Sequence, residues 1–441
     1  MNLRKTLLSL LAGTLCLLSF SAHGELSIQI TQGVDNPIPI AVVPFSWQGN
    51  GVLSEDVSQI VMNDLQQVGE FLPLSRSNML SLPSNEQEVF YRDWRILAQD
   101  YLLVGQIDRA PGSQLVQVQY EFFDINREIK LAGEVLTGSV TQLRDIAHEI
   151  SNVVFEQVTG TRGAFTTQIL YVVAEYVDPQ RTNFRLEKSD YDGQRAQVLL
   201  ESVEPIMSPA WSPTGLDVAY VSFETDLPRI YTQNIATGDR RQITNYPGLN
   251  SSPEWSPDGT KLAMVLSKDG NPDIYVQDLV TNQLTQVTNH PLIDTEPSWT
   301  ADSRSIVFMS ERTGQPQIYR IELGAAAYDV ERLTYECFQC LNATFLPDGV
   351  NLVHVRRETR QDPNYQIAVL NVETFRVIPS LTSTSLDESP SIAPNGSMIL
   401  YATKFNGRGV LDAVSIDGSV KFRLPSTQGD VREPAWSPFL N

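Results

Sequence analysis

Short runs of apolar residues, some of them alternating with polar ones, follow one another at regular intervals through the last two thirds of the chain. One group consists of the runs at 262–266, 274–276 and 284–288, separated by segments rich in Asp and Asn. Runs of this length between turn residues are typical of β-strands with at least one buried face. The pattern therefore predicts several small antiparallel sheets of similar size.

A recurring anchor marks each group of runs. It is a large apolar residue followed by Ser-Pro-Asp-Gly or a variant of that sequence, and it occurs at Trp211, Trp255, Trp299, Phe345, Ile392 and Trp436. Ser, Pro, Asp and Gly stand at the positions that each prefers in a type I turn. Successive anchors are 44, 44, 46, 47 and 44 residues apart, close to the length of a four-stranded propeller blade. Each unit is therefore predicted to form one blade.

The last anchor indicates how the ring of blades closes. No strand-like run follows Trp436, whereas three runs without an anchor, at 169–173, 183–186 and 196–200, precede the first complete unit. Together these fragments supply the four strands of one more blade. We therefore expect six blades, closed by the C-terminal strand, an arrangement that leaves no sheet edge open at the ring junction.

The residues before the propeller show a different pattern, in which helical periodicity alternates with strand-like runs. An apolar run at 37–45 precedes a helix that we expect Ser54 to cap, and further strand-like runs lie at 101–107, 115–123 and 129–136. A last helix is expected from a Thr141 cap to Gly160, because Ser and Thr favour helix starts and Gly favours helix ends. The pattern predicts a mixed α/β domain.

The fold class predicted from these patterns is a two-domain protein. An N-terminal mixed α/β domain at 25–162 is followed by a six-bladed β-propeller at 163–441. Residues 1–24 have the features of a secretory signal peptide: Arg4 and Lys5, then an apolar run, then a cleavage site of small residues that ends at Gly24. No other apolar stretch approaches the length of a membrane span. We therefore expect an exported chain without a membrane anchor.

The composition narrows the classes of partner. The formal net charge is −20, and removal of the signal peptide changes it to −22. Such acidity disfavours nucleic acids and anionic membrane surfaces as partners.

Cys337 and Cys340 are the cysteines that remain after cleavage. Three interpretations of this C-x-x-C pair are open. A disulfide is favoured in an oxidising compartment; a redox-active pair would require a βαβ context. A zinc site would require further ligands, and none of His148, His290 and His354 has the appropriate sequence spacing.

No catalytic constellation is evident in the sequence. There is no G-x-S-x-G nucleophile motif and no phosphate-binding loop, so we expect neither an enzyme nor a cofactor. A ring of positions three residues before the anchors is expected to line one mouth of the propeller channel, where it would bind a partner or, through its carboxylates, a cation: Ser208, Ser252, Glu296, Asn342, Ser389 and Glu433. The alternating segment 25–33 is either an edge strand or a detachable strand that can pair with another protein.

These motifs resemble one family over the whole length of the chain. The similarity rests on the segment 25–35, the Pro-Ile-Ala-Val-Val-Pro-Phe run, Ser-Asp-Tyr-Asp-Gly at 189–193, and the sequences around the first, third and last tryptophan anchors. Together they are similar to the TolB family of the periplasmic Tol-Pal system. The resemblance implies a periplasmic, non-enzymatic and monomeric adaptor that needs no cofactor or metal.

The resemblance also implies partners and contact residues. The Pal lipoprotein would bind at one channel mouth, with contacts at Leu249, Ser252, Thr295 and Glu296. The C-terminal domain of TolA would bind the mature N-terminal segment, which consists of Glu25, Leu26, Ser27, Ile28, Gln29, Ile30, Thr31, Gln32 and Gly33. Other outer-membrane proteins and bacteriocins are further partner classes, and the implied role is outer membrane integrity and invagination at division. The alternative is a secreted propeller enzyme or glycan-binding protein with an unrecognised channel site.

Overall fold

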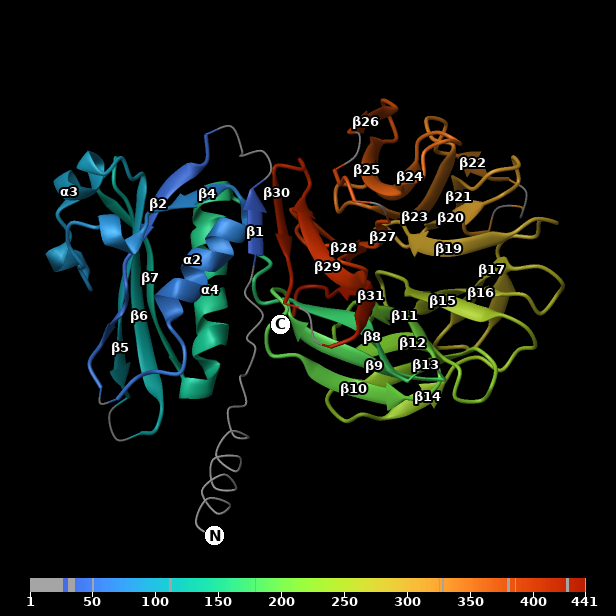
Figure 1. Ribbon diagram of the computed structural model, residues 1–441, viewed down its shortest axis with the longest axis horizontal. Coiled ribbons are helices and arrows are strands. Elements are labelled where there is room, and N and C mark those ends of the chain that lie inside the picture. Colours follow the sequence, from blue (N-terminus) through green and yellow to red (C-terminus); the bar gives the residue numbers. More distant parts are fainter. Residues whose placement is uncertain are drawn as a thin grey trace, which may run out of the picture.

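The computed structural model describes residues 27–30, 36–49, 51–110, 113–178, 180–324, 326, 329–378, 381–384, 386–425 and 428–440. Two bodies lie side by side, with an N-terminal α/β domain next to a ring of small sheets (Figure 1). The expected signal peptide at 1–24 lies outside the described residues. None of the helices in the described part of the chain has the length and apolarity needed to cross a membrane.

The described residues of the ring form six blades of four antiparallel strands each, as the repeat predicted. Five blades are continuous in sequence. Four of them consist of described strands of the propeller alone: β11 (Ile206–Trp211), β12 (Asp217–Ser222), β13 (Arg229–Asn234) and β14 (Arg240–Gln242); β15 (Asn250–Trp255), β16 (Lys261–Leu266), β17 (Asp273–Asp278) and β18 (Leu284–Gln286); β19 (Asp294–Trp299), β20 (Ser305–Ser310), β21 (Gln317–Glu322) and β22 (Glu331–Arg332); β23 (Gln339–Phe345), β24 (Asn351–Arg357), β25 (Gln366–Asn371) and β26 (Arg376–Ile378). The fifth, β27 to β30, pairs with a strand from the N-terminus, and the remaining blade joins the two ends of the propeller sequence.

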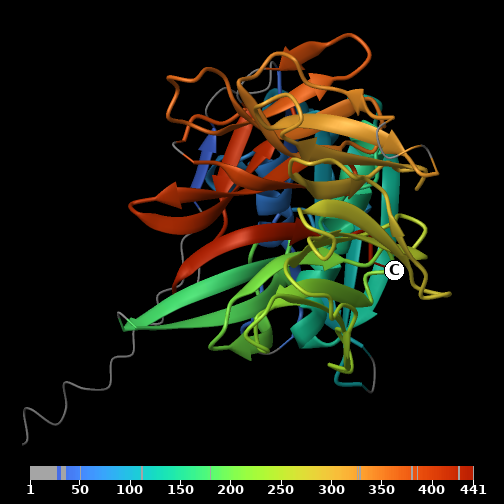
Figure 2. The same ribbon diagram turned by 90° about the vertical axis from the view of Figure 1, so that its right-hand side faces the viewer.

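The blade that closes the ring combines the start and the end of the propeller sequence. Its strand order is β10-β9-β8-β31, where β31 is the C-terminal strand. Trp436 pairs with Ile169, and the predicted closure is confirmed. The long β8–β9 hairpin projects beyond the neighbouring strands (Figure 2). The strands are β8 (Gln168–Asp178), β9 (Arg181–Asp190), β10 (Gln197–Ser202) and β31 (Asp430–Trp436).

The sixth blade carries an additional strand from the N-terminus. β1 pairs antiparallel with the outermost strand β30, so the sheet order is β1-β30-β29-β28-β27. In Figure 1, β1 lies beside β30, on the side of the propeller that faces the N-terminal domain. The strands are β1 (Ser27–Ile30), β27 (Glu388–Ile392), β28 (Met398–Phe405), β29 (Arg408–Ser415) and β30 (Val420–Arg423).

The tryptophan anchors connect neighbouring blades as well as ending the first strand of each. The Trp211 indole N–H donates to the Ala435 carbonyl at 3.0 Å, and that of Trp299 donates to the Glu254 carbonyl at 3.0 Å. Each bond reaches from one innermost strand to the previous one around the ring. A buried indole N–H usually has such a partner, although that of Trp255 has none. Trp211 and Trp299 therefore each link a blade to the one before it.

The N-terminal domain is a mixed sheet with helices on both faces. The sheet order is β4-β2-β5-β6-β7, and β3 pairs with β5. The antiparallel strands are long, but β2 is parallel to both of its neighbours. The elements are β2 (Ile38–Val42), β3 (Ser46–Trp47), α2 (Val57–Val68), β4 (Phe71–Pro73), α3 (Tyr91–Ile96), β5 (Tyr101–Arg109), β6 (Val116–Asp124), β7 (Ile129–Gly138) and α4 (Leu143–Thr159), with short 3-10 turns at Arg76–Asn78, Glu86–Glu88 and Val140–Gln142.

Two of the expected helix starts are wrong by a few residues. Asp56, and not Ser54, caps α2, because its carboxylate accepts the Gln59 N–H at 3.0 Å. The last helix begins with a 3-10 turn whose capping box is formed by Ser139 and Gln142, so Thr141 is not the cap. Gly160 ends α4 with φ 74°, as expected.

One apolar core runs across the junction of the two domains. It joins residues of α2 and α4, such as Leu65 and Phe155, to propeller residues such as Phe422 and Trp436. These side chains are almost fully buried. Since burial of a large apolar side chain contributes about 1.5–3 kcal/mol, the junction holds the two domains together as one unit.

Candidate functional site

The predicted channel ring is built from six backbone irregularities of the same kind. In each innermost strand the β-ladder shifts register at the ring position, which is the signature of a β-bulge. The ring residues all have left-handed backbones, with φ between 43° and 55°: Ser208, Ser252, Glu296, Asn342, Ser389 and Glu433. A positive φ is uncommon outside glycine. Because it repeats at six equivalent positions, the bulge is a regular structural feature of this mouth.

Two ring carboxylates join neighbouring blades. The backbone N–H of Asn342 donates to the Glu296 carboxylate at 2.7 Å. The backbone N–H of Ser208 donates in the same way to the Glu433 carboxylate. A bulge leaves its extra residue outside the ladder, so these carboxylates provide acceptors that the strand partners do not supply.

The innermost strands enclose a cavity of about 760 Å³ that runs into the ring. Its wall consists largely of Ser, Pro and Ala, together with the carboxylates of Glu254, Glu296, Glu388 and Glu433. Among the described residues that line it, Arg432 is the single cation. The cavity wall is therefore acidic.

Three of the channel acids, Glu254, Glu296 and Glu433, bind protons more tightly than ordinary carboxyl groups. Burial raises the pKa of Glu254 to about 8. Burial also raises the pKa values of Glu296 and Glu433, although the backbone N–H groups of Asn342 and Ser208 partly oppose it. An acidic wall with few cationic partners can accept N–H and O–H groups from a bound molecule. No described group of nucleophile and base is present in it.

Comparisons with known proteins match the domains in order along the chain. A family described as the TolB amino-terminal domain matches residues 26–131, and one described as the TolB beta propeller domain matches residues 155–440. The chain belongs to the TolB family. The resemblance and fold class predicted from the sequence are confirmed.

Relatives and solved structures agree with this assignment. The Tol-Pal system protein TolB of Pseudomonas aeruginosa is 53% identical over 440 residues, which cover 99% of this chain and 100% of the relative. The Tol-Pal system protein TolB of Pseudomonas fluorescens strain Pf-5 is 51% identical, with 100% of both chains covered. The crystal structure of TolB from Acinetobacter baumannii has a TM-score of 0.85 and 36% identity, over 94% of this chain and 100% of that chain.

The residues expected at the Pal-binding mouth lie around this TolB channel in different positions. Ser252 and Glu296 line the cavity. Thr295 is half-buried next to Glu296, opposite Met309 in the ladder. Leu249 precedes β15, packs against the apolar cluster between two blades, and donates its N–H to Ser267 Oγ at 2.8 Å. The four residues therefore share one end of the ring, but Leu249 also has a packing role.

The expected TolA-binding segment is described only in part. Ser27, Ile28, Gln29 and Ile30 form β1, whose backbone pairs with Val420–Arg423 of β30. Glu25, Leu26, Thr31, Gln32 and Gly33 lie outside the described residues. Of the two interpretations open for this segment, an edge strand agrees with the described pairing.

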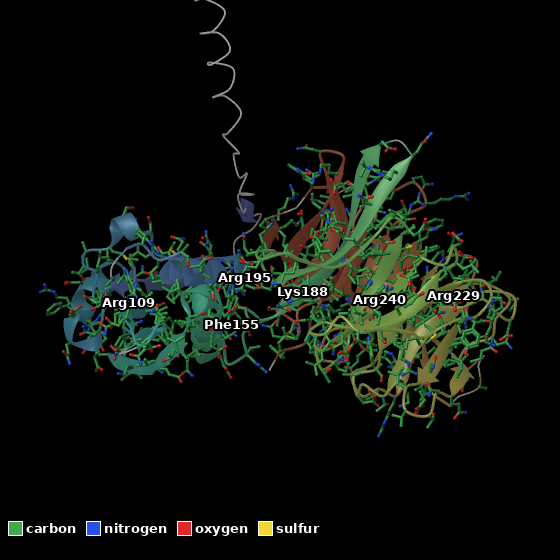
Figure 3. The ribbon with its side chains drawn as sticks, turned by 90° about the horizontal axis from the view of Figure 1, so that it is seen from below. Arg109, Phe155, Lys188, Arg195, Arg229 and Arg240 are labelled. Atoms are coloured by element: carbon green, nitrogen blue, oxygen red, sulfur yellow. A yellow bond between two sulfur atoms is a disulfide. The ribbon has the colours of Figure 1, made fainter. Side chains whose placement is uncertain are left out.

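A buried polar cluster at the domain junction was missed by the sequence analysis. The Asp64 carboxylate of α2 contacts His148 Nδ1 at 2.8 Å, Ser151 Oγ at 2.6 Å and the Tyr191 hydroxyl at 2.7 Å. Arg144 of α4 contacts Asp190 at the end of β9 and Asp192 in the turn that follows, and Arg195 contacts Asp190 and Asp145. Figure 3 shows Arg195 where the two domains meet. The signal was the Ser-Asp-Tyr-Asp-Gly sequence, for which no structural role had been inferred.

The C-x-x-C pair forms a disulfide in the structure, with Cα atoms 6.1 Å apart. The sequence spacing had offered no histidine to this pair, yet the β23–β24 pairing places His354 beside it. The ring of His354 is fully buried. Burial lowers its pKa to about 4, against the opposing effect of the Glu336 carboxylate. The imidazole is therefore neutral at physiological pH.

Proposed function

We propose that this protein is a non-enzymatic periplasmic adaptor of the Tol-Pal system. In this proposal it joins a peptidoglycan-binding lipoprotein of the Pal type to the C-terminal domain of TolA, and so contributes to outer membrane integrity and to invagination of that membrane at division. The observation that carries the proposal is the full-length match to Tol-Pal system proteins named TolB. Fold alone would not support it, because propellers serve many functions.

The channel mouth supports binding of a Pal-type partner. Its rim is rigid, since each blade contributes a bulged strand to it and two carboxylates bridge neighbouring blades. A rigid, acidic concavity loses little conformational entropy when a partner binds. The half-buried Thr295 lies one residue before the channel-lining Glu296 and outside the cavity wall, so it would contact the edge of a bound protein.

Thr295→Trp tests this surface. An indole at the rim should obstruct a docked protein and weaken Pal binding by at least about tenfold, a loss of about 1.4 kcal/mol. Calorimetric titration with Pal measures the affinity. Thr285→Trp is the matched control, because Thr285 is an exposed residue of the outermost strand β18 and should leave binding unchanged. Equal affinities for the two variants would place the Pal site elsewhere.

The N-terminal segment supports binding of TolA by strand addition. β1 uses one edge of a four-residue strand to pair with β30, so its other edge offers backbone groups to a second protein, or the whole strand can be released to one. Ordering a residue costs about 1–2 kcal/mol of backbone entropy. A four-residue strand is therefore held weakly enough to exchange.

Deletion of residues 25–33 tests this second contact. TolA binding should be lost, because the strand that would pair with TolA is gone. Pal binding should change by less than about tenfold, since β1, the described part of the deleted segment, is on the blade edge and not in the cavity wall. Titration of the truncated protein with each partner separates the two sites. Undiminished TolA binding would contradict the assignment of this segment.

A further inference from the structure

His354 is a buried histidine with one unused nitrogen. It lies in the middle of β24 with no exposed surface. Its Nδ1 is 3.5 Å from the Leu352 carbonyl, whereas its Nε2 has no hydrogen-bond partner. Buried polar side-chain atoms almost always have a partner. An imidazole nitrogen left free in this way is available to a ligand that binds a lone pair.

The free nitrogen faces two other potential metal ligands. The Glu336 carboxylate is 3.6 Å from His354 Nε2 and 4.0 Å from Cys340 Sγ. The ligand atoms of Glu336, Cys340 and His354 all lie within 4.8 Å of one another. Cys337 is bonded to Cys340, so its sulfur adjoins this group of three. Three side chains therefore converge beneath the loop before β23, and Cys337 can become a fourth ligand once its sulfur separates from that of Cys340.

Together with Cys337, these three side chains offer the four ligands that a structural zinc ion requires. Zinc prefers four ligands in a tetrahedron, with Zn–S distances of about 2.3 Å and Zn–N or Zn–O distances of about 2.0–2.2 Å, so neighbouring ligand atoms are about 3.3–3.8 Å apart. The His354–Glu336 and Cys340–Glu336 separations are already close to this range. The two sulfurs are too close together to be separate ligands of one ion, because they are covalently bonded. Cleavage of that bond would allow them to separate.

We propose that reduction of the Cys337–Cys340 disulfide converts this cluster into a zinc site with Cys337, Cys340, His354 and Glu336 as ligands. A dithiol reductant supplies two electrons: the S–S bond breaks, both sulfurs become thiols, and the reductant becomes a disulfide. Binding of Zn²⁺ then displaces the two thiol protons to solvent. The oxidised chain has a disulfide brace and the reduced chain has a metal brace at the same place.

The surroundings favour the charges of such a site. Two thiolates and one carboxylate around Zn²⁺ carry a net charge of −1. Arg356 is the strand partner of Cys340 and is almost fully buried, and its Nε has no hydrogen-bond partner. Its charge would offset that of the metal cluster. Glu336 is partly exposed and gives the ion a route from solvent.

Cobalt binding to the reduced protein tests the proposal. The chain without residues 1–24, and so without Cys16, is reduced with a dithiol that is then removed under argon. We expect one Co²⁺ per chain, with the thiolate-to-cobalt charge-transfer and tetrahedral ligand-field absorption bands, and displacement of Co²⁺ by Zn²⁺. The oxidised protein should lack these bands, even if channel carboxylates bind Co²⁺. Absence of thiolate bands from the reduced protein would overturn the proposal.

Variants assign the ligands one by one. The double variant Cys337→Ser, Cys340→Ser should lose the charge-transfer bands. Glu336→Gln, at a partly exposed position, should weaken binding by at least about tenfold. His354→Gln should do the same, and its folding is checked by circular dichroism because the position is buried. His290→Gln, a histidine outside the cluster, is the matched control. If Glu336→Gln and His354→Gln bind Co²⁺ as tightly as the control, the assigned ligands are wrong.

Discussion

Carboxylates gather at the domain junction and in the propeller channel, and their surroundings differ. At the domain junction, Asp64 has three hydrogen-bond partners, and Asp190 and Asp192 face Arg144 and Arg195. In the propeller channel, the acids line one cavity with a single cation among its described residues. The junction therefore has compensated charges, and the channel has largely uncompensated ones.

This difference shows which acids hold the fold together and which are available to a partner. Removing one member of a buried, paired set leaves the others without partners, so such a set resists change. A carboxylate without a cation costs free energy in the absence of a partner, and donors from another molecule would lower that cost. The junction is thus a structural contact, and the channel mouth agrees with the binding surface that we propose.

The largest effect should come from removing the centre of the junction cluster. Asp64→Ala leaves His148, Ser151 and the Tyr191 hydroxyl without their shared acceptor, and we expect the free energy of unfolding to fall by about 3–5 kcal/mol. Chemical denaturation measures the change. Glu388→Ala is the matched control, since Glu388 lies exposed at the channel and should change stability by less than about 0.5 kcal/mol. Similar losses for both variants would remove the distinction between the two regions.

In the channel, substitution of Glu254 should raise the free energy of unfolding, by less than the loss expected for Asp64→Ala. The pKa of Glu254 is about 8 in the folded protein against an ordinary value of 4.5. Ionisation of the unfolded chain therefore lowers wild-type stability as the pH rises from 4.5 towards 8. Glu254→Gln cannot ionise and should be more stable than wild type by about 1–3 kcal/mol near pH 9, because channel solvent reduces the full effect of about 1.4 kcal/mol per pKa unit.

Denaturation curves at several pH values check this expectation. The gain for Glu254→Gln should be absent below about pH 4 and should increase with pH. Glu296→Gln is the comparison within the channel, because the Asn342 N–H stabilises the Glu296 carboxylate and should make the gain smaller. A gain for Glu254→Gln that does not depend on pH would show that this carboxyl group titrates normally.

The propeller could be predicted from the sequence because the residues that define each blade lie close together along the chain. Each blade repeats its own turn residues and anchor, and the unpaired strands at the two ends of the repeat implied closure. The channel ring could also be located, since its positions stand at a constant offset from the anchors. Its bulges could not, because nothing in Ser208 or Asn342 by itself indicates a positive φ.

The junction and the cysteine cluster could not be predicted because their parts are distant in the sequence. Asp64 is 84 residues from His148 and 127 residues from Tyr191. His354 meets Cys340 only because β23 and β24 pair in a particular register. No histidine has metal-ligand spacing to the cysteines in the sequence, yet a β-hairpin places His354 beside them. The helix caps failed for a related reason, since several polar residues compete at each start and geometry selects one.

The smallest expected change in stability is the pH dependence that His148 contributes at the junction. Burial acts to lower the pKa of His148, but the Asp64 and Asp192 carboxylates raise it above its usual value of 6.5, with Arg144 opposing them. A protonated imidazole therefore contributes stability that is fully present below 6.5 and is lost as the pH rises through the folded-state pKa. His148→Gln should remove this loss.

The variants are compared in a Glu254→Gln background, because the channel acid would otherwise add a pH dependence of the same sign. Unfolding measured from about pH 5.5 to about pH 8 should then show a decline in stability for the protein that retains His148 and a flatter profile for the His148→Gln variant. Parallel profiles would mean that His148 stays neutral and that the junction, like the channel, contains a charge without a partner.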